Sequence, residues 1–238
     1  MSEPLRVEGL HNARDLDGLP RRGGGTTPSG VFVRSEQPDR VPDGGWTALR
    51  AHGVRTVLDL RQPGERADHR AAVPAGTVDL HVDHDGLEHA AFWAGYWDDG
   101  LVGTPLYYLP HLAAMPERTV AVLSAIATAP PGAVLFHCAG GRDRTGLIAA
   151  ILLVLADVEE DAIVADYLET IANAGALAIG QGRPSKEAAV ADLLASRGTT
   201  SEGAFRAFLA GLDVAALLAR LPADQAATLR TWRGALGG

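Results

Sequence analysis

The segment between residues 133 and 156 constrains the fold of this chain more than any other. It begins with the apolar, strand-like run AVLF at residues 133–136, passes through a loop of small residues, and ends in the sequence LIAAILLVLA at residues 147–156. A helix that is apolar on nearly every face must be buried, so the segment predicts a strand followed by a core helix packed against a sheet. The apolar run is far shorter than the ~20 residues that a bilayer span needs, which argues against a membrane helix.

Further short β-branched runs alternate with helical patterns along the first 140 residues. The predicted strands cover residues 31–34, 55–60, 78–82 and 133–136, and predicted helices cover residues 46–52 and 117–129. This alternation predicts an α/β fold, with a twisted, mainly parallel sheet of about four or five strands and helices on both faces. Residues 21–28 predict a turn at the tip of a hairpin.

Beyond Cys138 the pattern becomes helical, and no further strand is predicted. Predicted helices cover residues 161–172, 185–195, 201–212 and 223–236. The Gly- and Ala-rich residues 175–184 predict a loop or hinge. We expect residues 1–238 to form a single domain with a helical C-terminal part, because a chain of this length can bury one sizeable core.

Composition and charge restrict the partners of the chain. Hydrophobic residues make up 47% and charged residues 21%, as in ordinary soluble globular proteins. The formal net charge is -8, so no affinity for nucleic acid is expected, and an anionic substrate needs a local basic site. The first ten residues lack a secretory pattern, which predicts the cytoplasm and leaves export without a cleaved signal open. The oligomeric state stays open.

Cys138 is the single cysteine, which excludes an internal disulfide and a zinc site of several thiolates. Five residues separate it from Arg144, a spacing that lets the backbone curl around one centre with its N–H groups pointing inward. Gly140 and Gly141 permit the unusual backbone angles and the close approach that such a cradle requires. The helix from Thr145 onward presents its N-terminus to the cradle, where its dipole favours an anion and a thiolate.

These residue types suit the transfer of a phosphoryl group to sulfur. The thiolate of Cys138 is a nucleophile, and the planar guanidinium of Arg144 can hold two phosphate oxygens at once. Thr145 can donate a hydrogen bond to the sulfur when it leaves phosphorus, and His137 is expected to orient the loop through hydrogen bonds. The predicted phosphate-binding residues are Ala139, Gly140, Gly141, Arg142, Asp143 and Arg144.

The pattern of His and Cys, five residues, then Arg-Thr-Gly at residues 137–146 resembles the active-site loop of the protein tyrosine phosphatase superfamily. More narrowly, the chain resembles the bacterial tyrosine/serine and phosphoinositide phosphatases of the kind found in mycobacteria. Further similar segments lie at residues 12–19, 33–35, 55–61, 163–168 and 229–236. The likeness is close over residues 9–172 and thin over residues 173–222.

The resemblance implies cysteine-dependent hydrolysis of phosphate monoesters through a cysteinyl-phosphate, without a metal or other cofactor. It implies a phosphorylated protein or a phosphoinositide as substrate and leaves the choice among phosphotyrosine, phosphoserine and phosphoinositide open. The family usually has lysine in place of Arg142, so the charge is retained while the fork geometry differs. A helical lid or insertion within residues 173–222, with residues 185–212 over the cleft, is also implied.

The family further implies a general acid on the loop after the third strand, here residues 83–86. Asp85 aligns best with it, Asp83 comes second, and Asp143 in the cradle is a third candidate. The leaving oxygen needs such a proton donor, whereas a pseudophosphatase would bind phosphate or phosphotyrosine without one. Sulfurtransferases and arsenate reductases also use cysteine cradles, but the first more often have a shorter loop and the second normally need a second thiol.

The remaining polar and aromatic clusters are interpreted as structural. His81, Asp83, His84, Asp85 and His89 lack a recognised ligand spacing, so no metal site is predicted. Ion pairs that tie strand ends to the N-terminal segment are expected from Arg14, Asp15, Arg34, Asp59 and Arg61. The aromatic residues Trp93, Tyr96, Trp97, Tyr107 and Tyr108 are expected to fill core and cover loops, the alternative being a wall against a phosphotyrosine ring.

Overall fold

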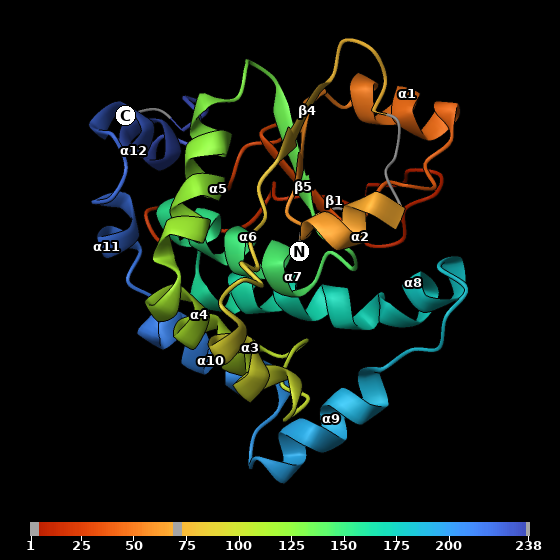
Figure 1. Cartoon of the computed structure of the whole chain (residues 1–238). Coiled ribbons are helices and arrows are strands. Elements are labelled where there is room, and N and C mark those ends of the chain that lie inside the picture. Colours follow the sequence, from red (N-terminus) through yellow and green to blue (C-terminus); the bar gives the residue numbers. More distant parts are fainter. Residues whose placement is uncertain (1–4, 69–72, 237–238) are drawn as a thin grey trace.

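A five-stranded sheet forms the centre of the protein in a computed structural model that describes residues 5–68 and 73–236 (Figure 1). The strands are β1 (Arg14–Asp15), β2 (Phe32–Ser35), β3 (Val54–Asp59), β4 (Val78–His81) and β5 (Ala133–His137). Their order is β1-β2-β5-β3-β4, with β1 antiparallel to β2 and every other pair parallel. The predicted α/β fold with a mainly parallel sheet is confirmed.

Helices surround this sheet and fill the C-terminal half. Before β5 they are α1 (Asp43–Ala51), α2 (Pro63–Asp68), α3 (Ala90–Trp97), the 3₁₀-helix η1 (Pro105–Tyr107), α4 (Tyr108–Ala114) and α5 (Pro116–Thr128). After β5 they are α6 (Asp143–Leu155), α7 (Glu160–Ala172), α8 (Ala174–Gly180), α9 (Glu187–Ser196), α10 (Ser201–Gly211), α11 (Val214–Leu218) and α12 (Ala223–Arg230). The short helices α2, α3, η1 and α4 were not predicted, because each is too short to show a clear helical period.

The central strand β5 is buried on both faces of the sheet. Val134 and Phe136 contribute to the larger core, which also contains the inner faces of α5 and α6. Ala133 and Leu135 contribute to a smaller core with α1 and the N-terminal segment. Alternate residues of a strand point to opposite faces, so this strand must be apolar at every position. Figure 1 shows α1 on one side of the sheet and α5 with α12 on the other.

The predicted core helix is α6, which follows β5 after a five-residue loop. All of its residues from Thr145 to Leu153 are buried, as the apolar sequence predicted. It packs against β2 and β5 and against helices α5, α7, α11 and α12. Because full burial of a Leu or Ile side chain stabilises a fold by ~1.5–3 kcal/mol, this helix holds the loop before it rigidly on the core.

The predicted loop or hinge at residues 175–184 is wrong for its first half, which forms α8. Leu177 and Ala178 are buried, and the Ala- and Leu-rich composition outweighs the cost of Gly175. Together α7 and α8 span residues 160–180, a helix long and apolar enough by length and composition to cross a membrane. In the fold, however, its inner face carries Asp166 and Tyr167 into the core.

The C-terminal helices belong mainly to the core. In α10, Phe205 stacks on Tyr167 at 4.0 Å between ring centroids, and Phe208 meets Tyr108 edge-on at 5.2 Å. Of the implied lid at residues 185–212, residues 185–187 and 190 line the cleft, whereas α10 packs one face, with Phe205 and Phe208, on the core. The lid stays a prediction for the first of these segments. The predicted final helix stops at Arg230, because the chain turns with positive φ so that Trp232 packs against Phe32.

Candidate active site

The loop of residues 138–142 lies at the carboxyl edge of the sheet, between the end of β5 and the start of α6. Gly141 has a φ of 67°, and a Cβ atom there would lie 2.5 Å from the carbonyl oxygen of Ser35, so only glycine fits. Gly140 has no such constraint, since a Cβ atom there would meet nothing closer than 3.9 Å. The predicted unusual backbone angle is thus found at Gly141 and not at Gly140, whose close approach to a phosphate stays a prediction. Cys138 is buried at the start of the loop.

Hydrogen bonds from outside hold the carbonyl groups of this loop. The Ala139 carbonyl accepts from the Gln37 amide at 3.2 Å and the Gln181 side chain at 3.3 Å. The carbonyls of Gly140 and Gly141 accept from the side chains of Asn12 at 3.2 Å and Arg34 at 2.8 Å. In a trans peptide the N–H points opposite to the C=O, so the next amides are turned toward the centre of the loop. This is the geometry of an anion cradle.

A buried group of charges supports the cradle from below. Asp166 in α7 accepts from Arg14 Nε at 2.6 Å and also forms an ion pair with Arg34, and these side chains are almost fully buried. Thr170 Oγ1 accepts from Arg14 Nη2 at 2.8 Å. Burial alone would raise the pKa of Asp166, but the charges of Arg14 and Arg34 hold it below the ordinary value. The predicted structural ion pairs of both arginines are confirmed.

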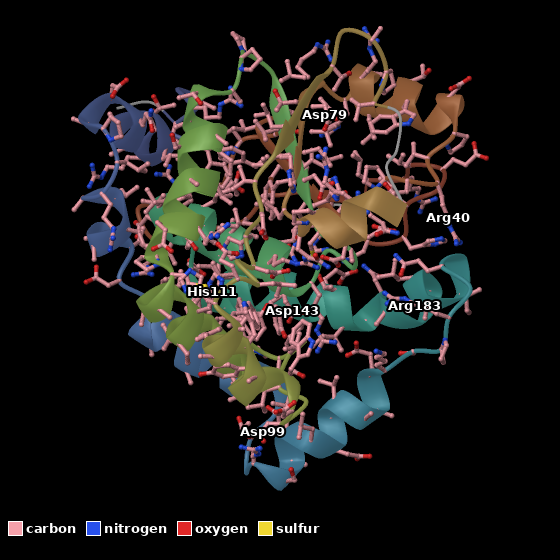
Figure 2. The ribbon with its side chains drawn as sticks, in the orientation of Figure 1. Arg40, Asp79, Asp99, His111, Asp143 and Arg183 are labelled. Carbon is pink, nitrogen blue, oxygen red and sulfur yellow. The ribbon has the colours of Figure 1, made fainter. Side chains whose placement is uncertain are left out.

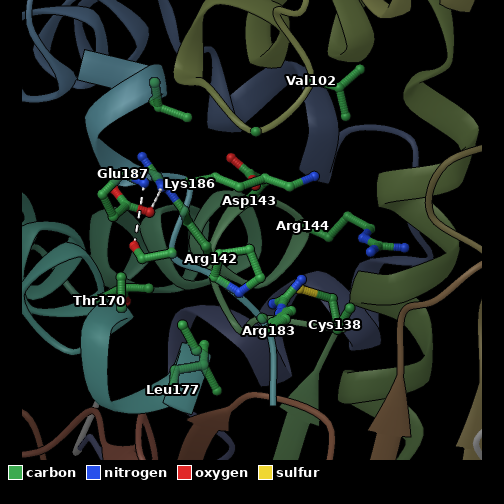
Figure 3. A pocket seen from close by; sticks show the side chains of 18 residues that line it. Val102, Cys138, Arg142, Asp143, Arg144, Thr170, Leu177, Arg183, Lys186 and Glu187 are labelled. Atoms are coloured by element: carbon green, nitrogen blue, oxygen red, sulfur yellow. Dashed lines mark hydrogen bonds and ion pairs between the residues drawn. The ribbon is translucent and has the colours of Figure 1, made fainter. Parts of the chain in front are cut away.

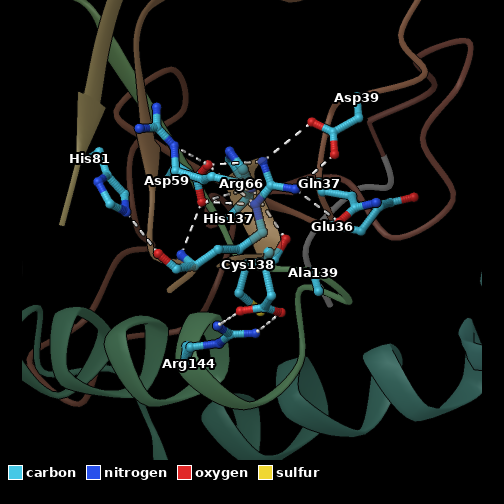
Figure 4. Close-up of polar contacts among 12 residues, drawn as sticks. Glu36, Gln37, Asp39, Asp59, Arg66, His81, His137, Cys138, Ala139 and Arg144 are labelled. Atoms are coloured by element: carbon cyan, nitrogen blue, oxygen red, sulfur yellow. Dashed lines mark hydrogen bonds and ion pairs between the residues drawn. The ribbon is translucent and has the colours of Figure 1, made fainter. Parts of the chain in front are cut away.

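A second polar group ties β3 to the base of the loop (Figure 4). Asp59 accepts from Arg61 Nη2 at 2.9 Å, and Arg61 also contacts Asp39 at 2.7 Å. His137 Nδ1 lies 3.2 Å from the Cys138 carbonyl oxygen and 4.0 Å from Asp59 Oδ1. Burial lowers the pKa of His137, which favours the neutral ring. Asp15 is the last of the five residues for which structural ion pairs were predicted. It lies at the far end of β1, where it accepts a hydrogen bond from the Gly30 amide at 2.6 Å.

Arg144 points across the mouth of the cradle and contacts two carboxylates. Its Nη1 lies 2.5 Å from Glu65 Oε2 and 2.8 Å from Asp85 Oδ2, and its Nη2 lies 2.9 Å from Glu65 Oε1. Burial acts to lower the pKa of Arg144, but these acidic neighbours raise it well above its ordinary value. Three of the five guanidinium N–H groups are used. The Nε–H and the second Nη2–H have no partner among the described residues, and they lie on one edge, where a phosphate can accept from both.

Asp85 lies on the loop after β4 and is fixed through its backbone. Its carbonyl oxygen accepts from Trp93 Nε1 at 3.0 Å, and its amide donates to Asp83 Oδ1 at 3.0 Å. Burial raises the pKa of Asp85 to about 6. The positive charge of Arg144 acts to lower this pKa, and the negative charge of Glu65 acts to raise it. A carboxyl group with such a pKa is about half protonated at pH 6 and still about one-tenth protonated at pH 7, far more than an ordinary aspartate.

The other two candidate acids are engaged elsewhere. Asp83 accepts from two backbone amides of its own loop and lies 3.6 Å from Arg118. Asp143 Oδ1 accepts from the hydroxyl group of Tyr108 at 2.8 Å. Of the three, Asp85 alone contacts Arg144 within the described part of the chain.

Thr145 lies in the first turn of α6, one residue after Arg144. Its hydroxyl oxygen is buried and has no hydrogen-bond partner among the residues that the structure describes. A buried hydroxyl without a partner costs free energy, so its presence calls for a reason. A contact with the Cys138 sulfur that forms during the reaction would supply one.

The histidines of the predicted polar cluster serve the fold. His84 Nε2 lies 3.0 Å from Thr119 Oγ1, and His81 Nε2 lies 2.8 Å from the Arg61 carbonyl oxygen. The His89 amide donates to the Gly86 carbonyl at 3.0 Å. Residues 5–68 and 73–236 contain no group of three or more His, Cys, Asp or Glu side chains placed to hold a metal ion.

A cavity of about 260 Å³ opens above the cradle (Figure 3). Its floor is residues 138–140 and 142–144, and its walls come from α7, α8, residues 183–186, the start of α9 and residues 102–103. The apolar wall residues are Val102, Ala174, Leu177, Ala178 and Val190. None of the five aromatic residues after the acid loop lines this cavity. Trp93, Tyr107 and Tyr108 are buried in the core and Tyr96 packs against it, as expected, whereas Trp97 is 54% exposed.

Four residues of the site were not identified from the sequence: Glu65, Asp166, Gln181 and Glu187. Glu187 forms an ion pair with Arg142 and so joins α9 to the cradle. The sequence did contain an indication that Asp166 is buried. It lies three residues after Ile163 and directly before Tyr167, on the apolar side of the helix. Nothing in the sequence distinguishes Glu65 from other acidic residues near the surface.

Comparison with known proteins shows the family of this chain. The sequence model of the tyrosine phosphatase family matches residues 5–215. The chain is 32% identical over 218 residues to a Cupriavidus necator protein that carries the name putative tyrosine-protein phosphatase, a match that covers 87% of this chain and 79% of that protein. It is 30% identical over 171 residues to the triple specificity protein phosphatase PtpB of Mycobacterium tuberculosis, covering 59% of this chain and 61% of that protein.

A weaker likeness links the chain to a solved structure, that of a Cys-to-Ser variant of Pseudomonas aeruginosa TpbA in complex with phosphotyrosine. The TM-score is 0.35 and the identity 18%, with 87% of each chain covered, so no argument rests on it. The family match extends over most of the chain and includes the whole cradle, Glu65 and Asp85. This chain belongs to the tyrosine phosphatase family.

Proposed function

We propose that this phosphatase hydrolyses phosphotyrosine in proteins, with Cys138 as nucleophile, Asp85 as general acid and base, and Arg144 as the phosphate clamp. The observation that carries this proposal is the convergence of three groups at one point. A buried cysteine lies within inward-turned amides, and the arginine above it keeps one bidentate edge open. The same arginine contacts a carboxyl group whose pKa is raised to about 6.

The first chemical step transfers the phosphoryl group to sulfur. The Cys138 thiolate attacks phosphorus and forms the S–P bond, while the bond from phosphorus to the ester oxygen breaks. The protonated carboxyl group of Asp85 gives its proton to that leaving oxygen. The amides of the cradle and the open edge of Arg144 hold the equatorial oxygens, where negative charge is spread in the transition state.

The second step releases phosphate and restores the thiolate. Asp85, now ionised, takes a proton from water as the water oxygen attacks phosphorus, and the S–P bond breaks with its electron pair on sulfur. The buried hydroxyl group of Thr145, which has no partner among the described residues, can donate a hydrogen bond to the sulfur as the S–P bond breaks. The position of Asp85 supports turnover over the alternative of a binding-only pseudophosphatase.

The cavity above the cradle favours an aromatic phosphate ester. Beside the charged side chains of its rim, the cavity lining includes Val102, Leu177, Ala178 and Val190, which suit an apolar ring better than the hydroxyl-rich ring of an inositol. A phosphoinositide remains the second candidate substrate, since Arg142 places an additional cation in the cavity lining.

Hydrolysis of p-nitrophenyl phosphate in the presence of EDTA tests the proposed chemistry. Wild-type protein should turn over without added metal, and Cys138→Ser should abolish turnover while it still binds phosphate. Turnover that persists in Cys138→Ser, or that disappears with EDTA, would refute the cysteine mechanism. A comparison of kcat/KM for phosphotyrosyl peptides and for a short-chain phosphoinositide then tests the substrate class.

A further inference from the structure

Four cations line the cavity above the cradle, and they differ in their partners. Arg144 contacts Glu65 and Asp85, and Arg142 forms an ion pair with Glu187. Arg183 and Lys186 also line the cavity, but neither has a carboxylate within ion-pair distance in residues 5–68 and 73–236. In a chain with a net charge of -8, two cations without acidic partners beside an anion-binding cradle point to an anion supplied by a ligand.

The segment that carries these cations is tied to the cradle at both ends. On one side, the Gln181 side chain donates to the Ala139 carbonyl at 3.3 Å. On the other, Glu187 pairs with Arg142. The Arg183 amide donates to the Ala178 carbonyl at 3.0 Å, which closes the end of α8. The segment between α8 and α9 therefore has a defined place beside the site.

The side chain of Arg183 reaches back over the cradle (Figure 3). Its Nη2 atom lies 4.0 Å from the position that a Cβ atom on Gly140 would take. Gly140 has neither a positive φ nor a backbone clash, and the atoms that face its Cα are the side chains of Leu177 at 3.9 Å and Arg183 at 4.0 Å from that Cβ position. An anion held by Arg183 would thus lie beside the scissile phosphate and at the rim of the cavity, since Arg183 is exposed.

We propose that Arg183 and Lys186 form a second anion subsite, which binds an acidic side chain next to the phosphotyrosine of a protein substrate. The inference rests on the proposed function, because it places the phosphotyrosine ring against the apolar wall. From there the peptide backbone leaves the cavity past its rim, where both cations are exposed. A glutamate or aspartate beside the phosphotyrosine would meet them there.

The expected contribution is moderate, since the two cations are exposed to solvent. Exposed ion pairs change affinity by roughly two- to fivefold each, so two of them should favour an acidic peptide over a neutral one by about tenfold in kcat/KM. The preference should lie mainly in KM, because the contact is the same in the ground state and the transition state. It should shrink as salt is added, since screening weakens exposed pairs.

The test compares two phosphotyrosyl peptides that differ only in glutamate or alanine on both sides of the phosphotyrosine. Wild-type protein should prefer the glutamate peptide by about tenfold, and the double variant Arg183→Gln/Lys186→Gln should bring the ratio close to one. Arg197→Gln is the matched control, because Arg197 is exposed and pairs with Asp99 at the other end of α9. Figure 2 shows Asp99 far from Arg183. This control should keep the wild-type ratio.

Three outcomes would overturn the proposal, two of them from the peptides and one from a phosphoinositide. One is an equal kcat/KM for both peptides with the wild-type protein, and the other is a full preference in the double variant. Preference for a short-chain phosphoinositide over both peptides would also contradict it, since it would assign the subsite to a headgroup. If wild-type protein fails to turn over p-nitrophenyl phosphate, the proposed mechanism has failed. The subsite is then tested by binding alone. The dissociation constants of both peptides are measured for Cys138→Ser and for Cys138→Ser that also carries Arg183→Gln/Lys186→Gln.

Discussion

The substitution Asp85→Asn should change activity and stability in opposite directions. The free enzyme must carry a proton on Asp85 to protonate the leaving oxygen, so kcat/KM should fall as pH rises through about 6. Loss of a general acid costs ~10²–10⁴ in rate, and the variant should lose this basic limb of the pH profile. Asp83→Asn and Asp143→Asn keep an acceptor for the amides and for Tyr108, so each should lose less than about tenfold.

The stability effect follows from the sign of the same pKa shift. Burial raises the pKa of Asp85 from an ordinary 3.8 to about 6, so the native state binds this proton more tightly than the unfolded chain does. The free energy of unfolding therefore decreases as pH rises from about 4 to 6, and the charge destabilises the fold by up to about 3 kcal/mol above that range. A neutral amide removes that cost. Asp85→Asn should be more stable than wild type at pH 8 and similar near pH 4.

Urea unfolding of both proteins at pH 4.5 and pH 8, followed by circular dichroism, measures this difference. The quantity to compare is the free energy of unfolding of the variant minus that of the wild type. The reasoning would be refuted if this difference were no larger at pH 8 than at pH 4.5. It would equally be refuted by a variant that retains the basic limb of kcat/KM at its wild-type position, since another group would then carry the proton.

Three further substitutions test the neighbours of this group. Arg144 Nη1 lies 2.5 Å from Glu65 Oε2 and 2.8 Å from Asp85 Oδ2, so the two carboxylates share one nitrogen. Glu65→Gln removes the first charge, so the basic limb of kcat/KM should move to lower pH by about one unit or more. The KM for p-nitrophenyl phosphate should rise. An unchanged limb would exclude this coupling. Asp166→Asn leaves two buried arginines without their carboxylate and should lower the free energy of unfolding at pH 7 by about 3–5 kcal/mol, measured by urea titration. Because the pKa of Asp166 is held below its ordinary value, the wild-type advantage should disappear as pH falls through that lowered pKa; an advantage that persists in strong acid would contradict the ion-pair account. Thr145→Val keeps the volume and removes the hydroxyl group, so single-turnover kinetics should show slower breakdown of the cysteinyl-phosphate with little loss of stability, whereas equal breakdown rates would rule out its contact with sulfur.

The sequence predicted the parts of the fold that depend on local pattern. β5 and α6 were identified because a strand buried on both faces and a helix buried all round leave a continuous apolar signal. α8 was missed because its glycines suggested a hinge, whereas the burial of Leu177 against the site, a tertiary contact, decides for helix. The end of α12 was missed for a similar reason, since the packing of Trp232 lies outside any local pattern.

The sequence also predicted the part of the site that is contiguous in the chain. Cys138 and Arg144 are close because the loop is short, so their spacing alone indicated a cradle. Asp85 and Glu65 reach Arg144 from other loops, and only the fold brings them together. The family resemblance supplied Asp85 through alignment, but it supplied no reason to choose Glu65.

The arrangement of charges around Arg144 links substrate binding to the protonation of Asp85. One edge of the guanidinium holds Glu65, its Nη1 also holds Asp85, and the remaining edge is open for phosphate. A phosphate dianion bound on that edge adds negative charge near Asp85 and offsets the positive charge that keeps its carboxylate ionised. Binding therefore raises the pKa of Asp85 above its value in the free protein, and the acid gains its proton in the complex where the leaving oxygen needs it.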